Sequence, residues 1–107
     1  MKMTHSTVLV AMSLLDDPNG RHWGYELSQA SGVRSGVMYP ILTRMLDEGW
    51  LEDGWEDESV TAAEGRPPRR YYVLTDEGKV GLGAMLRRAE SEKRFRPVLG
   101  GALGWTS

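Results

Sequence analysis

Three arginines stand close together around a pair of prolines in the second half of the chain, in the stretch Gly65-Arg66-Pro67-Pro68-Arg69-Arg70. A guanidinium group binds phosphate oxygens bidentately, and it also suits a narrow minor groove of DNA. The two prolines keep the backbone extended, so less conformational entropy is lost on binding. The stretch therefore predicts contacts with phosphate groups, although pairing of the same arginines with nearby acids would give only a solvated patch.

A second group of polar side chains stands at the expected start of a helix, in Ser35-Gly36-Val37-Met38-Tyr39-Pro40. Proline is tolerated in the first helical turn, where no backbone N–H group is needed, so we expect the helix to begin near Gly36 or Val37. Ser35 and Tyr39 carry hydroxyl groups that can bind phosphates or base edges. Gly36 allows close approach of the backbone, and the free N–H groups at a helix start suit a phosphate.

The elements that position these residues follow from hydrophobic periodicity and turn signals. Residues 4–16, 23–30 and 35–48 predict three helices, and residues 50–56 and 70–74 predict the two strands of a hairpin with a long, mobile connection. Thr75 is expected to cap a fourth helix that ends at Pro97 and is followed by a loose tail. The chain is thus predicted to be mainly α with a small β-hairpin, in the order of a winged helix-turn-helix.

In a winged helix-turn-helix the third helix enters the major groove of DNA, and the hairpin forms a wing that lies beside it. Thr43 lies one turn beyond Tyr39 on the same helix face, and Arg44 is placed to reach a phosphate. The residues predicted to bind DNA are Ser35, Gly36, Val37, Tyr39, Thr43, Arg44, Arg66, Arg69 and Arg70.

The net charge of −2 argues mildly against DNA binding, because a DNA-binding face is expected to be basic. The charges are sorted along the chain, however: residues 47–64 carry eight acids and no Lys or Arg, whereas residues 65–71 carry three arginines and no acid. Acidic groups repel phosphates, so we expect the arginines at the base of the wing to touch DNA, and not the tip at residues 56–64. The alternative is a protein-interaction module whose winged helix has lost DNA binding.

Length and composition indicate one globular domain of 107 residues, with 40% apolar and 26% charged residues. The chain has no cysteine, which fits a reducing cytoplasm. Its longest apolar stretch, residues 8–15, is too short to cross a bilayer. His5 and His22 are isolated, so no metal site is expected. Without a nucleophile–base set or a phosphate-binding loop, we expect neither an enzyme nor a cofactor.

Several stretches, taken together in their order and spacing, resemble the PadR family of transcriptional regulators over about residues 8–90. Each stretch alone is a weak signal, but the combination is specific. The stretches are Gly24-Tyr25-Glu26-Leu27, Ser35-Gly36-Val37-Met38-Tyr39-Pro40-Ile41-Leu42, Gly49-Trp50-Leu51-Glu52 and Arg66-Pro67-Pro68-Arg69-Arg70-Tyr71-Tyr72-Val73-Leu74-Thr75-Asp76-Glu77-Gly78. The short, glycine-bearing fourth helix is similar to that of the compact members of the family.

The resemblance implies a homodimeric regulator, usually a repressor, that binds a palindromic operator in double-stranded DNA. It implies a DNA-binding domain at residues 1–75, a dimerisation helix at 76–97 in the same compact unit, and a flexible tail at 98–107. The fourth helix, helped by the first, would contact the partner through Val8, Met12, Leu82, Met85, Leu86, Ala89 and Phe95. Some relatives release DNA when a small aromatic molecule binds, and Met85 and Ala89 could line such a pocket, with plain dimer packing as the alternative.

Overall fold

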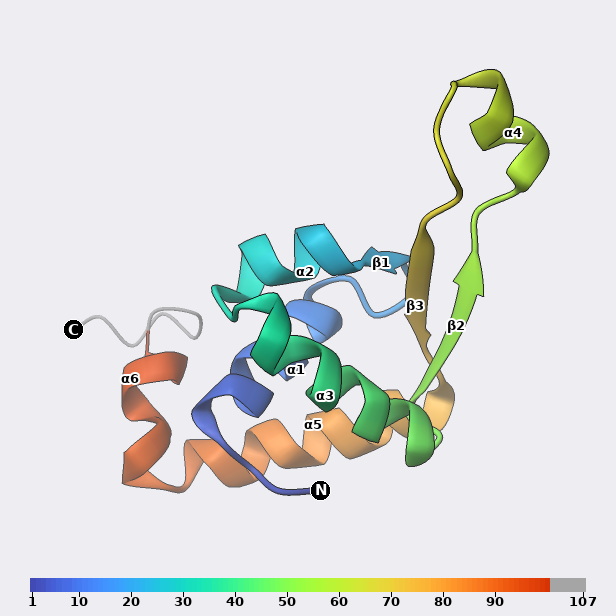
Figure 1. The fold of residues 1–107 in the computed structure, drawn as a ribbon. Helices are drawn as coiled ribbons and strands as arrows, with labels where there is room; N and C mark the ends of the chain where they lie inside the picture. The colour runs from blue at the N-terminus through green and yellow to red at the C-terminus, as the bar shows by residue number, and fades with distance from the viewer. Residues whose placement is uncertain (101–107) are drawn as a thin grey trace.

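The computed structural model describes residues 1–100, in which four longer helices form a bundle and a hairpin projects from it (Figure 1). The helices are α1 (His5–Asp16), α2 (Gly24–Ser31), α3 (Ser35–Asp47) and α5 (Asp76–Glu90). α1 lies at the centre and contacts α2, α3 and α5. The fold is therefore a mainly helical unit with a small sheet, as the sequence predicts.

Local signals fix the ends of these helices. The Thr4 side chain accepts a hydrogen bond from the amide of Thr7 at the start of α1, and Thr75 accepts one from Gly78 at the start of α5. α2 ends at Gly32, whose φ of 71° lies in the left-handed region that favours glycine. The predicted cap at Thr75 and the predicted stop after α2 are confirmed.

The hydrophobic core joins the inner faces of the helices to one face of the sheet. Its side chains are apolar and buried, and those of Leu14 on α1, Met38 and Met45 on α3 and Leu82 on α5 have no exposed surface. β3 contributes Tyr72, which is 2% exposed, whereas its neighbour Tyr71 is half-buried on the other face. The core leaves the outer faces of α2 and α3 free.

The sheet has three antiparallel strands, one more than predicted, in the order β1-β3-β2. β2 (Leu51–Trp55) and β3 (Arg70–Leu74) form the expected hairpin. β1 (His22–Trp23) pairs with the other edge of β3, with His22 opposite Tyr72 and Trp23 opposite Tyr71. The prediction that Trp23 begins the second helix is therefore wrong: it belongs to β1, and α2 begins at Gly24.

The connection between β2 and β3 was expected to be long and mobile at its tip, and no helix was predicted in it. It contains a short helix, α4 (Glu58–Ala63). The Asp57 side chain caps this helix by accepting from the amide of Ser59. Thr61 is 1% exposed, and its carbonyl oxygen accepts from the amide of Arg66. The tip of the wing, at the top of Figure 1, is thus a folded helical turn.

Two details of the helix boundaries differ from the predictions. α3 begins at Ser35, as the range 35–48 predicts, and not near Gly36 or Val37, as Pro40 suggested. Pro40 therefore lies in the second turn, where its missing N–H group leaves the fourth preceding carbonyl without the usual intrahelical bond. α5 ends at Glu90 and not at Pro97; Lys93–Phe95 form a 3₁₀ turn, and Pro97 lies in the first turn of α6 (Arg96–Leu99). Leu99 is buried, and the rest of the predicted tail, from residue 101, lies outside the described residues.

Candidate nucleic-acid interface

α3 has one buried face and one exposed face, and every residue of this helix predicted to bind DNA lies on the exposed face. Met38, Ile41, Leu42 and Met45 are buried in the core. Val37 and Tyr39 are 42% and 43% exposed, so apolar and aromatic surface lies beside the polar groups of this face. Ser35, Gly36, Thr43 and Arg44 are also exposed. The helix therefore offers a mixed polar and apolar surface that the domain itself leaves uncovered.

The first turn of α3 suits an anion. No side chain caps its amide groups, and it contains no acidic residue. A β-carbon at Gly36 would meet nothing within 4 Å, so the backbone is accessible there. The positive end of the helix dipole and the free N–H groups are what a phosphate binds.

Two cations accompany this helix without an ion-pair partner among residues 1–100. Arg34 is the residue before the first turn, and Arg44 lies in the last turn. Both are exposed, and neither is within ion-pair distance of an acid in the described part of the chain. Arg34 was not among the residues predicted to bind DNA. Its place directly before α3, the helix expected to enter the major groove, was the feature that could have identified it.

Tyr39 is held over the start of α2 by a glycine. A β-carbon at Gly24 would overlap the Tyr39 hydroxyl group, so only glycine lets the ring lie there. Tyr39 also lines a pocket of about 320 Å³ together with Trp23, Tyr25, Glu26, Arg69, Arg70 and Tyr72. The residues that line this pocket come from α3, from α2 and from the wing, so these three parts of the molecule share one continuous surface.

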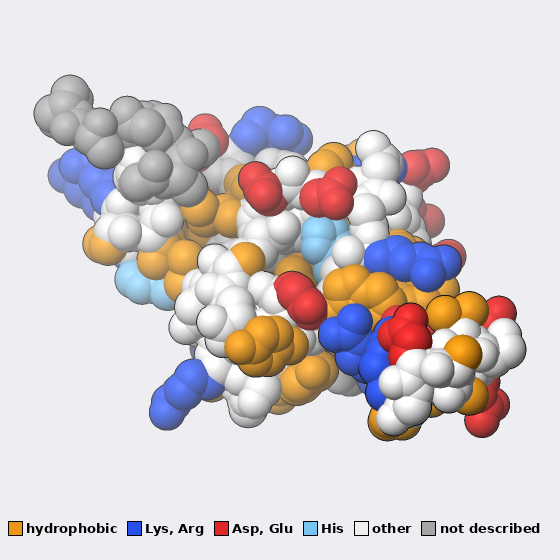
Figure 2. Space-filling view, turned by 90° about the horizontal axis from the view of Figure 1, so that it is seen from above, with side chains coloured by type: hydrophobic (Ala, Val, Ile, Leu, Met, Phe, Trp, Pro, Cys, Tyr) orange, Lys and Arg blue, Asp and Glu red, His pale blue; other side chains and the backbone are white. Residues whose placement is uncertain are grey.

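The wing arginines are paired with acids, which was the alternative considered for them. Arg66 donates through Nη1 and Nη2 to the two carboxylate oxygens of Glu56 at 2.6 and 2.8 Å, and through Nε to Glu64 at 2.9 Å. Arg70 lies 2.6 Å from Asp53 on the neighbouring strand. Blue and red side chains accordingly lie against each other at the wing, beside an apolar patch (Figure 2).

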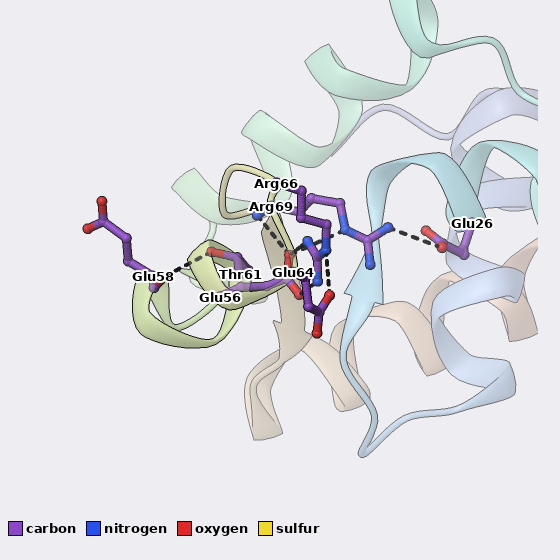
Figure 3. Close-up of polar contacts among 7 residues, drawn as sticks. All are labelled: Glu26, Glu56, Glu58, Thr61, Glu64, Arg66 and Arg69. Carbon is purple, nitrogen blue, oxygen red and sulfur yellow. Dashed lines mark hydrogen bonds and ion pairs between the residues drawn. The ribbon is translucent and has the colours of Figure 1, made fainter.

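Arg69 connects the wing to α2. Its backbone amide and its Nε donate to Glu56 at 2.9 and 3.3 Å, and its Nη1 lies 3.7 Å from Glu26 (Figure 3). Its guanidinium group lies 4.9 Å from the centre of the Trp23 ring. Arg69 therefore contacts Glu56 of the wing, Trp23 of β1 and Glu26 of α2 at once.

The hydrogen bonds from Arg66 are the main reason that the pKa of Glu56 is lowered from 4.5 to about 2. Desolvation raises it, and the Arg69 amide and side chain lower it further. The same pair raises the pKa of Arg66. The Glu56 carboxylate is thus firmly ionised at neutral pH.

Most of the residues predicted at a dimer interface are used inside the protomer. Val8, Leu82, Ala89 and Phe95 have no exposed surface, and Met85 is 6% exposed. They are buried because α5 and the turns that follow it pack against α1. Met12 and Leu86 are half-buried and keep some surface for a partner. Met85 and Ala89 lie in this core and do not line the pocket beside Tyr39.

The helix-turn-helix, its exposed third helix and the adjacent wing define a DNA-binding regulator of the winged-helix class. The chain belongs to the PadR-like family of transcriptional regulators, whose family model matches residues 12–84. No functionally curated protein matches the sequence.

Three solved structures are similar to the chain. A PadR family transcription regulator from hypervirulent Clostridium difficile R20291 shares its fold at a TM-score of 0.66 and 22% identity, over 90% of this chain and 98% of that one. A PadR-like regulator from Bacillus cereus ATCC 14579 has a TM-score of 0.57 and 26% identity, covering 91% and 88%. A padR family regulator from Eggerthella lenta DSM 2243 has a TM-score of 0.54 and 25% identity, covering 92% and 83%.

No helix within residues 1–100 is both long enough and apolar enough to cross a membrane.

Proposed function

We propose that the protein is a homodimeric, sequence-specific transcriptional repressor that reads a palindromic operator with α3. The observation that carries the proposal is the exposed face of α3, on which Val37 and Tyr39 are 42% and 43% exposed. Ser35, Gly36 and the helix amides are placed for phosphates, whereas Tyr39 and Thr43 are placed for base edges. Arg34 and Arg44 supply the charge that the paired wing arginines do not.

Replacement of Tyr39 tests this reading. Tyr39→Ala is expected to weaken binding to the operator about ten- to a hundred-fold, the range for loss of one base contact, and to affect random DNA less. Affinities for both duplexes are measured by fluorescence anisotropy at one salt concentration. Tyr39→Phe keeps the ring and separates the contribution of the hydroxyl group, and thermal unfolding checks that both variants fold. Equal losses on operator and random DNA would show that Tyr39 does not read sequence.

The homodimer is proposed from the family, and its contact must use surface that the protomer leaves open. Met12 and Leu86 are the two predicted interface residues that keep exposed surface, and Val80 on α5 is 71% exposed. Single exposed apolar side chains are common on monomers, so Val80 serves here as an accessible position on α5 at which to test the contact. Sedimentation equilibrium of wild type and Val80→Glu tests this: the charge should shift the protein toward monomer.

Release of DNA by a small aromatic ligand remains part of the proposal, but the ligand pocket is placed beside Tyr39 and not at Met85 and Ala89. The pocket between Trp23, Tyr25, Tyr39 and Tyr72 is lined by aromatic rings and has arginines at its edge. A ligand there would compete with DNA, because Tyr39 belongs to the reading surface. Quenching of tryptophan fluorescence by a library of aromatic compounds, followed by a DNA competition assay, tests for such a ligand.

The second candidate function is a protein-interaction module that does not bind DNA. It is favoured by the ion pairs that occupy all three wing arginines and by the net charge of −2. A steep loss of DNA affinity with added salt supports the repressor, because released counterions make phosphate binding salt-dependent. Absence of DNA binding at low salt supports the module.

A further inference from the structure

The Glu56 carboxylate occupies a site built from four hydrogen-bond donors. Arg66 Nη1 and Nη2 hold its two oxygens at 2.6 and 2.8 Å, and the Arg69 amide and Nε approach one of them at 2.9 and 3.3 Å. The Glu56 side chain is only 15% exposed, far less than the 54% of Glu64. These donors enclose one anion at the base of the wing.

A phosphodiester would use the same donors. A guanidinium fork accepts a carboxylate or a phosphate in the same bidentate geometry, and a backbone amide binds either. The fork of Arg66 points at Glu56, whereas Arg69 meets Glu56 through its amide and Nε and directs its Nη1 at Glu26 (Figure 3). A DNA phosphate can therefore take these four donors only by displacing the Glu56 carboxylate. The displaced carboxylate would then lie beside the phosphate and repel it.

We propose that Glu56 is an internal competitor of DNA phosphate: its carboxylate fills the anion site of Arg66 and Arg69 in the free protein and lowers the contribution of the wing to DNA affinity. The inference rests on the proposed DNA-binding function and specifies how that function is restrained. Because the site recognises an anion and no base, the restraint acts on operator and random DNA alike. Recognition of the base sequence by α3 is not affected by this restraint.

Glu58 provides a matched control on the same wing. Its side chain makes no ion pair among the described residues and points away from the arginines in Figure 3. Glu56→Gln and Glu58→Gln each remove one negative charge, but only the first weakens the hold on the four donors around Glu56. Arg66 keeps its contact with Glu64, and Arg69 keeps its contact with Glu26. The comparison therefore separates release of the donors from the general effect of charge.

The experiment measures DNA affinity of the full chain at several salt concentrations. Glu56→Gln is expected to bind operator and random duplex about tenfold more tightly than wild type, with the logarithmic salt slope steeper by about one to two. Glu58→Gln is expected to change affinity less than about threefold. Glu56→Ala gives a second variant without an amide that could still hold the arginines, and thermal unfolding verifies each fold.

Arg66→Gln with Arg69→Gln completes a double-mutant cycle. The two substitutions should cost more affinity in the Glu56→Gln background than in wild type, because only there are the donors that face residue 56 no longer held by a carboxylate. Equal costs in both backgrounds, or equal affinities of folded Glu56→Gln and Glu58→Gln, would overturn the inference while leaving DNA binding by α3 intact. If neither wild type nor any variant binds duplex DNA, the proposed function itself fails.

Discussion

Each wing arginine has a carboxylate partner in the structure, and we propose that this pairing limits what it can add to DNA affinity. Arg66, Arg69 and Arg70 were singled out for phosphate binding because arginines around a stiff Pro-Pro pair suit an anion. The structure shows that Glu56 and Asp53 are the anions nearest to them. The sequence predicted that these arginines bind an anion. Which anion they bind in the folded protein depends on how β2, α4 and β3 bring Glu56 and Asp53 next to them.

Stability should depend on pH through Glu56. Its pKa is about 2 in the folded protein and near 4.5 when unpaired, so the unfolded chain takes up a proton first as pH falls. The contribution of the ionised carboxylate is therefore fully present above about pH 4.5 and is lost progressively toward pH 2. Urea unfolding of wild type and Glu56→Gln at a series of pH values measures it.

The difference in stability between these two proteins is expected to be constant from pH 7 to 5 and to shrink below pH 4.5. Glu58→Gln, which removes an acid that has no arginine partner, is the control for the loss of one charge. A difference between wild type and Glu56→Gln that does not change down to pH 3 would contradict the pairing of Glu56 with Arg66.

Residue-scale prediction succeeded where a local pattern decides burial and did not extend to long-range contacts. Ser35 and Tyr39 were expected at the surface because they stand at the start of the helix, and the structure exposes both. Contact of Tyr39 with Gly24 joins residues far apart in the chain. No periodicity in one segment predicts such a contact, because it depends on how α2 and α3 cross.

At the scale of elements, the helices and the hairpin were predictable because each has a clear period and clear end signals. β1 was not, since a strand of two residues has no detectable alternation and exists only because β3 offers a free edge. α4 was missed because a connection holding Gly65, Pro67 and Pro68 is typical of a loop. Its Asp57 cap was the signal that could have found it.

The glycines of α5 test how this helix packs. A β-carbon at Gly78 would overlap the carbonyl oxygen of Trp50, whereas one at Gly83 would meet only the flexible end of Arg87, at 3.5 Å. Gly78→Ala is therefore expected to destabilise the fold by about 1–3 kcal/mol through overpacking. Gly83→Ala is expected to stabilise it by about 0.5–1 kcal/mol through helix propensity.

Urea unfolding measures the free energy of unfolding of the two alanine variants, and each variant is the control for the other. Stabilisation by both substitutions would show that α5 does not lie against the backbone of Trp50. The sequence suggested only that glycines weaken this helix; the structure shows that Gly78, and also Gly81 under the Trp50 ring, allow its close approach.

At the scale of the whole molecule, the wing and the C-terminal turns lie at opposite ends of an elongated protomer of 49 × 27 × 24 Å (Figure 1). The close packing of α1 with α5 and the turns after it buries most side chains that the family resemblance assigned to a dimer contact. The resemblance predicted the architecture, but one protomer's sequence does not show which apolar residues it keeps for its own core. Two reading helices on a dimer remain the proposed way to contact two half-sites.

The central claim, that the protein reads a specific duplex sequence through α3, is tested most directly by selecting bound fragments from sheared DNA at two salt concentrations. The account predicts a two-fold symmetric sequence with half-sites about one helical turn, or roughly 34 Å, apart. It also predicts that Tyr39→Ala recovers this sequence poorly while still binding DNA at low salt. Recovery of no sequence above background by the wild-type protein at low salt would contradict the claim and leave the interaction module in its place.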